Sequence, residues 1–459
     1  MSEMFTIEKL AADLAAGKVS SRMLVEQALA NIDDKASFGG PVFLVVDREN
    51  ALASADQMDA LRLAGRAPSR FAGIPFSAKD LFDIAGQVTT AGSVVLKNEQ
   101  PAERDCVAIA RLKERGFICL GRTNMTEFAY SGVGLNPHYG TPKSIWDRGP
   151  NSAGGRIPGG SSAGAAVSVG DGTCVMGIGT DTGGSCRVPA AFNGLVGFKA
   201  SLGRVPTTGV FPLASSFDTV GPLTNTVQCC ATGDAIMAGD WDGVIVKRPL
   251  QGLRLGVPQS LVLDDVDDDV AMVFGTALTR LACNGAEIVD IDFKELEQLP
   301  EINAGGGIGA FEAYGVHADL LAQKGNEYDQ RVRKRILAGA NITPTDIVAL
   351  KKRRSEMIAR ADGLMADVDA FIMPTAPQIP AAIADLKHDD DYGRINLLAL
   401  RNTFVGNFLN RCAISVPAHE TGEAPVGLML MAPLSADEHL FSVAQAVEEI
   451  ISPNLKKYT

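Results

Sequence analysis

The chain has 459 residues, with 42 lysines and arginines against 54 aspartates and glutamates, and its formal net charge at neutral pH is −12. This acidic balance argues against a surface that binds polyanions, so we expect no direct contact with nucleic acid. No apolar run approaches the ~20 residues that a membrane-spanning helix needs, and the amino terminus has no secretory pattern. We therefore expect a cytoplasmic protein that does not bind membranes.

The amino-terminal residues 1–65 have the spacing of apolar side chains that is typical of helices packed on a core. A β–α–β pattern follows, with strands predicted at 74–79 and 117–123 on either side of a helix at 106–116. After a glycine-rich stretch at 121–210, strands and helices alternate again, and the last strands expected are 369–374 and 411–417. This rhythm predicts an α/β protein.

The chain shows no internal repeat and no low-complexity linker, which argues for one large unit. Within it we expect a helical segment at 1–65 that packs on the core. A core at 66–240 would carry the catalytic residues. The remainder, 241–459, would belong to the same α/β domain and lie on the side of the substrate pocket.

Eight cysteines are scattered through apolar segments, with no CxxC pair and no cysteine and histidine at the spacing of a metal site. Reduced thiols buried in a core are the simplest interpretation. The sequence thus predicts no metal. Cys186 merits attention because it adjoins Ser185.

Three kinds of glycine-rich loop compete for the middle of the chain. A P-loop needs a lysine that residues 154–160 lack, and residues 177–183 are one residue too long for a dinucleotide-binding turn. The sequence GSSAG at 160–164 fits the nucleophile elbow of α/β-hydrolases around Ser162, but that elbow must follow a strand, and NSAGGRIPG cannot form one. It would also need a downstream histidine, and each candidate has an ordinary surface or loop context: His317, His388, His419 and His439.

The segment GIGTDTGGSCRVPA, residues 177–190, predicts the end of a buried strand, a tight turn, and a serine at the start of the next element. Backbone N–H groups beside Ser185 could hold a developing oxyanion, which suits a nucleophile. No histidine is nearer in sequence than His138, so the base could be a lysine, provided that burial keeps it neutral. Lys79 ends a mostly apolar strand, although a lysine in such a place is more often solvated.

Four segments, in order, resemble the amidase signature family: GIPFSAKDLFDIAG, PGGSSAGAAVSVG, GTDTGGSCRVPAAFNGLVGFKASLGRV and SSFDTVGPL. The correspondence is strong over residues 70–225 and looser elsewhere. The resemblance implies a single large domain with a mixed central β-sheet covered by helices on both faces. It also implies a catalytic triad with Ser185 as nucleophile, Ser161 as the bridging serine on a cis peptide after Gly160, and Lys79 as the base.

The resemblance further implies acyl transfer through a covalent intermediate, with no cofactor. Asp181 would bond backbone groups of the turn, and Ser162 would cap or support the next helix. By family position, Ser131 and Gly132 would line the substrate pocket. Backbone N–H groups of three residues would hold the oxyanion: Thr182, Gly183 and Gly184.

The substrate that the resemblance implies is a small-molecule amide. The family includes free amidases and the glutaminase (A) subunit of a tRNA-dependent amidotransferase, which works with partner chains. The segment TNMTEFAYSGVGLNPHYGTP resembles free amidases more, and Leu400 stands near the place where the glutaminase would need an acidic residue. We favour a free amidase, and we keep two alternatives, a non-catalytic binding protein on the same fold and the glutaminase subunit.

Three arginines lie on one predicted helix: Arg331, Arg333 and Arg335. A solvated basic face is the simpler interpretation, and contact with an acidic substrate is the other. Members of the family are often dimers, so a homodimer is an expectation from the resemblance as well.

Overall fold

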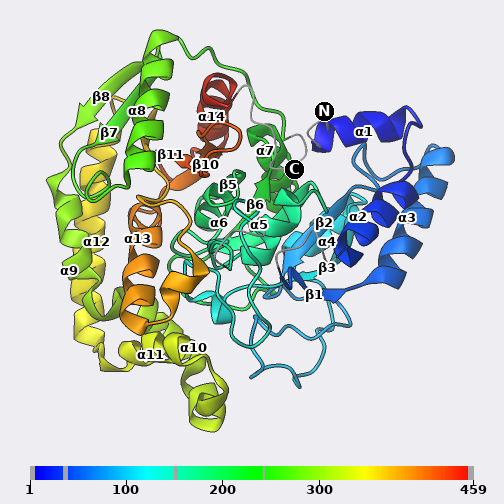
Figure 1. The fold of residues 1–459 in the computed structure, drawn as a ribbon, viewed down its shortest axis with the longest axis horizontal. Helices are drawn as coiled ribbons and strands as arrows, with labels where there is room; N and C mark the ends of the chain where they lie inside the picture. Colours follow the sequence, from blue (N-terminus) through cyan, green and yellow to red (C-terminus); the bar gives the residue numbers. More distant parts are fainter. Residues whose placement is uncertain (1–5, 35–39, 149–153, 241–242, 453–459) are drawn as a thin grey trace.

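Eleven strands form one sheet in the computed structural model, which describes residues 6–34, 40–148, 154–240 and 243–452. The strand order is β1-β3-β2-β4-β6-β5-β10-β11-β9-β7-β8 (Figure 1). The pairs β2/β3, β2/β4, β7/β8 and β7/β9 are parallel and the remaining pairs are antiparallel, so the sheet is mixed, as predicted. The strands are β1 (Phe43–Val46), β2 (Pro75–Lys79), β3 (Ile118–Thr123), β4 (Met176–Asp181), β5 (Val196–Lys199), β6 (Thr219–Thr224), β7 (Arg254–Pro258), β8 (Glu287–Ile291), β9 (Ala370–Pro374), β10 (Cys412–Pro417) and β11 (Gly427–Ala432).

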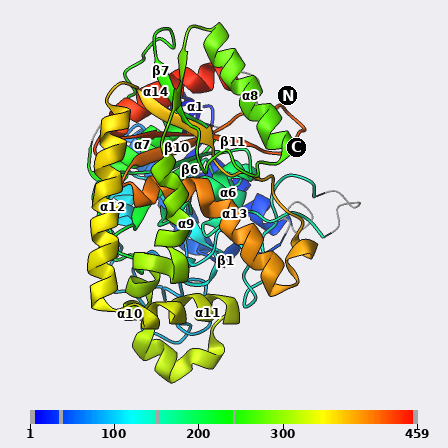
Figure 2. The same cartoon turned by 90° about the vertical axis from the view of Figure 1, so that its left-hand side faces the viewer.

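Helices cover both faces of this sheet (Figures 1 and 2). Figure 2 shows α10 and α11 together at one end of the molecule, beyond α13. The helices within the described ranges are α1 (Ile7–Ala15), α2 (Ser21–Asp33), α3 (Arg48–Leu63), α4 (Val107–Glu114), α5 (Ala163–Gly170), α6 (Arg187–Ala191), α7 (Val227–Ala238), α8 (Asp268–Cys283), α9 (Leu299–Ile302), α10 (Gly307–Lys324), α11 (Gln330–Ala338), α12 (Pro344–Met365), α13 (Asp389–Phe408) and α14 (Asp437–Ile451). None of them is long and apolar enough to span a bilayer.

Side-chain alternation along the central strands divides the core into two layers. Ile414 and Leu430 belong to the cluster that contains residues of α8 and α14. Their sequence neighbours Ala413 and Met431 belong to the cluster that contains residues of α12 and α13. Because successive side chains of a strand point to opposite faces, strands covered on both sides must be apolar throughout, and these strands are.

Most predicted elements are present with shifts of a few residues. The strands predicted at 117–123, 369–374 and 411–417 are β3, β9 and β10, and the helix predicted at 106–116 is α4. The helical expectation for 1–65 missed β1, an edge strand that pairs antiparallel with β3. Its four residues, Phe43–Val46, are too few to show an alternating pattern. The division of the chain at 65 and 240 stays a prediction.

A buried ion pair joins β2 to β3 beside the carboxyl end of β2. Arg122 Nε lies 2.5 Å from Asp80 Oδ1, and each side chain is 1% exposed. We expect Arg122→Met to lower the free energy of unfolding by ~3–5 kcal/mol, because it leaves the Asp80 charge buried without its cation. Urea denaturation measures this change.

The matched control is Arg353→Met. Arg353 also pairs with a carboxylate, that of Glu301, but both side chains are largely exposed. Exposed pairs contribute roughly 0–1 kcal/mol, so this variant should unfold close to the wild type. Equal losses in the two variants would contradict the role given to burial.

Candidate active site

Lys79 is the last residue of β2, and its side chain lies at the sheet edge where β2 and β4 both end. The two strands are parallel neighbours, with Ser77 opposite Gly177, so their carboxyl ends share this edge. Lys79 Nζ lies 2.7 Å from Ser161 Oγ and 2.9 Å from Thr180 Oγ1, within hydrogen-bond distance of both. The structure thus brings together two of the three residues of the predicted triad by a direct hydrogen bond.

Lys79 is fully buried, which settles the choice between a solvated and a buried lysine. Burial lowers its pKa from the ordinary value to about 8, and the nearby carboxylates of Asp181 and Asp218 only partly oppose this effect. A lysine with this pKa is neutral in part of the population near neutral pH. It can therefore accept a proton.

Ser161 follows a cis peptide bond, Gly160–Ser161, as the family resemblance implied. Its backbone is held on both sides: Gly160 N donates to Gly132 O at 2.7 Å, and Thr126 N donates to Ser161 O at 3.2 Å. A Cβ at Gly160 would lie 2.7 Å from Gly134 N, closer than such atoms approach. Glycine is therefore required before the bridging serine.

Asp181 organises the turn that carries Ser185. Its carboxylate accepts the N–H groups of Gly184 at 2.9 Å and Cys186 at 3.1 Å, the residues on either side of the serine. This confirms the expectation that Asp181 bonds backbone groups of the turn. Gly184 has φ 137°, and a Cβ there would lie 2.1 Å from Thr403 Oγ1, so only glycine fits.

Arg187 is the ion partner of Asp181. Its Nη2 lies 2.8 Å from Asp181 Oδ1, and both side chains are fully buried. Burial by itself would raise the pKa of Asp181, but the charge and hydrogen bonds of Arg187 outweigh it and hold that pKa at about 2. Asp181 is thus a carboxylate at any pH at which the protein works.

The N–H groups around Ser185 differ in their availability. Gly184 N–H, one of the three predicted oxyanion donors, already donates to Asp181. Among the described residues, the N–H groups of Thr182, Gly183 and Ser185 have no such acceptor. Ser185 is 4% exposed, whereas Lys79 and Ser161 are each 0% exposed, so the nucleophile candidate is the triad member with access to solvent.

A second carboxylate braces the start of the turn. Thr182 Oγ1 donates to Asp218 Oδ1 at 2.5 Å. The other Asp218 oxygen accepts the N–H groups of Leu213 at 2.9 Å and Ala214 at 3.0 Å. Burial raises the pKa of Asp218 to about 6. The turn is therefore tied to the loop 213–218 through one side chain.

Helix α13 closes over the turn, and sequence reasoning missed its part in the site. Thr403 Oγ1 donates to Gly183 O at 2.8 Å, and Asn407 Nδ2 donates to Asp181 Oδ1 at 3.0 Å. Polar residues at helical spacing in an otherwise apolar segment are the signal that could have revealed this face.

Ser131 and Gly132 are held by the same helix. Ser131 Oγ donates to Asn396 Oδ1 at 2.9 Å and accepts from Tyr392 Oη at 2.7 Å, and Gly132 N donates to Asn396 Oδ1 at 2.8 Å. A Cβ at Gly132 would lie 2.6 Å from Leu400 Cγ. The hydroxyl of Ser131 is thus occupied by α13, and a role for the two residues in lining the pocket stays a prediction.

The nucleophile-elbow alternative finds no support, since no strand directly precedes Ser162. Ser162 stands at the N-cap of α5 without a capping hydrogen bond, and its hydroxyl donates to Thr180 O at 3.4 Å, so it supports the site rather than caps the helix. The expectation of surface or loop histidines is wrong for His317 and His419. Both are buried, and burial lowers their pKa to about 4.

All eight cysteines lie in the described residues and are free thiols. Six are buried as expected, Cys119 is half-buried, and Cys283 is exposed at the end of α8, which corrects the expectation there. Cys186 is fully buried, and burial raises its pKa, so it stays protonated. A buried thiol of this kind does not compete with Ser185 as a nucleophile.

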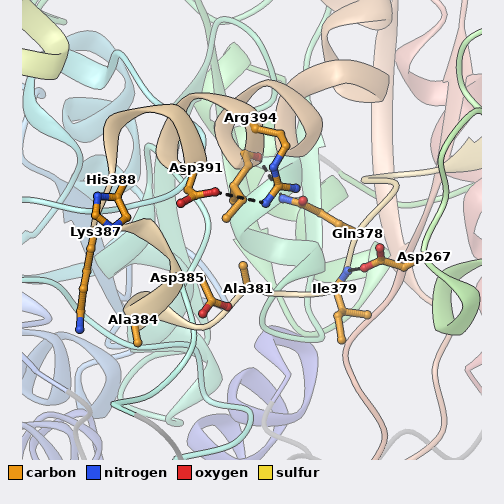
Figure 3. Close-up of a pocket in the computed structure, with 11 residues that line it drawn as sticks. Asp267, Gln378, Ile379, Ala381, Ala384, Asp385, Lys387, His388, Asp391 and Arg394 are labelled. Atoms are coloured by element: carbon orange, nitrogen blue, oxygen red, sulfur yellow. Dashed lines mark hydrogen bonds and ion pairs between the residues drawn. The ribbon is translucent and has the colours of Figure 1, made fainter.

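Two cavities lie outside the triad. One of about 500 Å³ is beside the amino-terminal end of α13, where Figure 3 shows Asp391 paired with Arg394 and Asp267 bonded to Ile379. The other, of about 530 Å³, is beside α10. Neither is lined by a triad residue. In the described part of the chain, no group of three or more metal-binding side chains could hold a metal ion.

Comparison with known proteins identifies relatives over most of the chain. A family model described as Amidase matches residues 24–441. The chain is 36% identical over 411 residues to a 2-amino-5-chloromuconic acid deaminase of Comamonas testosteroni, which covers 88% of this chain and 87% of the relative. It is 32% identical over 489 residues to the glutaminase (A) subunit of the glutamyl-tRNA(Gln) amidotransferase of Chromohalobacter salexigens, with 98% of each chain covered.

A solved amidase structure superposes with a TM-score of 0.87 at 27% identity, covering 98% of this chain and all of that one. The chain therefore belongs to the amidase family and is a hydrolase of amide C–N bonds. The higher identity to the deaminase than to the amidotransferase protein confirms the predicted resemblance to free amidases.

The burial of Lys79 makes a prediction about stability. The unfolded chain takes up the lysine proton near pH 10.5, whereas the folded chain does so only near pH 8. Stability should fall as pH drops across this window and be level, with respect to this group, below it. We expect Lys79→Met to be more stable than the wild type at pH 7 by up to ~3 kcal/mol.

Urea unfolding at pH 7 and near pH 10 measures the difference, which should shrink at the higher pH. Lys334→Met is the control because Lys334 is exposed. A Lys79→Met protein that is less stable than the wild type at pH 7 would show that the hydrogen bonds of Lys79 outweigh its burial.

Proposed function

We propose that this member of the amidase family hydrolyses a small-molecule carboxylic amide to an acid and ammonia or an amine through an acyl-enzyme on Ser185. One observation carries the proposal: the buried hydrogen bond of 2.7 Å between Lys79 Nζ and Ser161 Oγ, next to the turn that bears Ser185. A binding protein on this fold would have no use for a neutral lysine bonded to a serine.

The proposed proton path runs from Ser185 through Ser161 to Lys79. Neutral Lys79 takes the Ser161 proton as Ser161 takes the proton of Ser185, and Ser185 Oγ attacks the amide carbonyl carbon. Thr180 accepts an N–H of Lys79 at 2.9 Å, which leaves the lysine lone pair for Ser161. When the tetrahedral intermediate collapses, the C–N bond breaks and the proton returns through Ser161 to the leaving amine. Water then hydrolyses the ester.

The N–H groups of Thr182, Gly183 and Ser185 would hold the oxyanion. Gly184 would contribute through the fixed shape of the turn, because its own N–H donates to Asp181. Donors that are oriented before the reaction are worth ~2.7–4 kcal/mol each in comparable enzymes.

The second candidate is the glutaminase of a tRNA-dependent amidotransferase, which the 98% coverage by the Chromohalobacter relative favours. Against it, Leu400 packs directly against Gly132 and offers no charge to an amino group. The amide panel should include glutamine for this reason. It should also include amides that carry a carboxylate, because the Comamonas relative is named for an amino acid with acid groups. A cytoplasmic location and a homodimer stay predictions.

Labelling of the intact protein with a fluorophosphonate tests the nucleophile. We expect a single adduct on Ser185, none in Ser185→Ala, and labelling slowed at least ~100-fold in Ser161→Ala and Lys79→Ala, since general-base assistance is worth ~10²–10⁴ in rate. Mass spectrometry of the labelled peptide locates the adduct, and circular dichroism checks that each variant is folded.

The other outcomes are equally informative. An adduct on Ser162 would revive the nucleophile elbow. The absence of any adduct on folded wild-type protein would favour the binding protein. Labelling of Lys79→Ala at the wild-type rate would overturn the assignment of the base.

The pH dependence of turnover follows from the same lysine. Only neutral Lys79 can accept the proton, so kcat/KM should rise with pH and level off above a pKa of about 8. Initial rates between pH ~6 and ~10 on one amide measure this limb. A limb near the ordinary lysine value of ~10.4 would show that Lys79 is solvated in the working enzyme.

A further inference from the structure

Helix α11 packs against the substrate loop instead of presenting a solvated basic face. Arg335 Nη1 donates to Tyr130 O at 2.9 Å, and its guanidinium lies 4.5 Å from the centroid of the Tyr130 ring. One turn earlier, the Arg331 guanidinium lies 4.3 Å from the centroid of the Tyr392 ring. The expectation of a solvated face is therefore wrong for these two arginines.

Both aromatic rings border Ser131. Tyr130 precedes it in the chain, and Tyr392 Oη donates to Ser131 Oγ at 2.7 Å. The amino-terminal end of α11 is attached to the same loop, because Asp329 N donates to Glu127 Oε2 at 2.7 Å. Helix α11 thus grips the segment 127–132 near both of its ends.

This segment needs such support. Phe128 and Ala129 have φ of 49° and 60°, in the left-handed region that side chains other than glycine rarely adopt. Conformations of this kind persist only where the surroundings hold them. The surroundings here include α11 and the aromatic packing of Phe128 against Tyr328, whose ring centroids are 5.0 Å apart.

The segment in turn fixes the residue before Ser161. Gly132 O accepts the Gly160 N–H at 2.7 Å, and a Cβ at Gly160 would lie 2.9 Å from Ser131 O. A shift of the loop would therefore move the Gly160–Ser161 peptide and change the distance between Ser161 Oγ and Lys79.

We propose that α11 is a positioning element for the bridging serine: Arg335 and Arg331 hold Tyr130 and Tyr392, and through them the loop that seats Ser161 against Lys79. The inference rests on the proposed function, because it matters only if Ser161 relays a proton. Arg335 and Tyr392 act through the loop and touch no reacting atom.

Saturation kinetics of fluorophosphonate inactivation separate this role from simple structural support. The concentration dependence gives KI for probe binding and kinact for phosphonylation, in which Ser185 Oγ displaces fluoride. We expect Arg335→Met to lower kinact about 10-fold with KI changed less than ~2-fold, because misplacement of a catalytic group by ~1 Å can lower rates as much as ~100-fold. Rates are taken per labelled site, so unfolded protein does not contribute.

Three further variants sharpen the test. Arg335→Lys keeps the charge and a donor for Tyr130 O but loses the planar stacking, so kinact should be intermediate. Tyr392→Phe removes one hydroxyl and keeps the ring under Arg331, and it should also lower kinact. Lys334→Met removes a positive charge from an exposed position on the same helix and should leave kinact unchanged.

The outcomes distinguish this inference from the proposed function. If wild-type Ser185 is not labelled, the proposed function fails. If the wild type is labelled and both Arg335→Met and Tyr392→Phe match its kinact, the positioning role is overturned. Should Arg335→Met not fold, Tyr392→Phe decides, since the loss of one hydroxyl leaves the packing intact.

Discussion

The buried lysine at the end of β2 is the constraint on which the site depends. A lysine accepts a proton only when it is neutral, and it is neutral near physiological pH only when it is kept from water. Lys79 has two hydroxyl partners, Ser161 and Thr180, and no carboxylate within ion-pair distance among the described residues. Hydroxyls satisfy its N–H groups without stabilising the ammonium form as an ion pair would.

The pairing of Asp181 with Arg187 follows from the same requirement. The carboxylate is needed to fix the N–H groups of Gly184 and Cys186, yet its charge raises the pKa of Lys79. Arg187, fully buried at 2.8 Å from Asp181, offsets much of that charge. The turn thus gains an anion that organises its backbone while the field at the lysine stays weak enough to preserve the lowered pKa.

The sequence motifs predicted the triad residues, the turn and the mixed α/β sheet because these depend on local patterns or on a close family resemblance. The burial of Lys79 could not be predicted, since the strand end fits a solvated lysine equally well. Contacts of Thr403 and Asn407 with the turn join positions more than two hundred residues apart, for which periodicity gives a helix but no partner. The two arginines of α11 looked like a polar surface for the same reason: the aromatic rings that they cover are distant in sequence.

The titratable groups around Ser185 are spread so that a single one changes charge in the working range. Asp181, with its pKa held at about 2, is a carboxylate throughout. Burial raises the pKa of Asp218 to about 6, so it loses its proton before Lys79, at about 8, does. Burial also keeps Cys186 a thiol. Between these limits, the hydrogen bonds that shape the turn stay constant while the base changes state, and proton transfer from Ser185 proceeds on a scaffold that does not titrate with it.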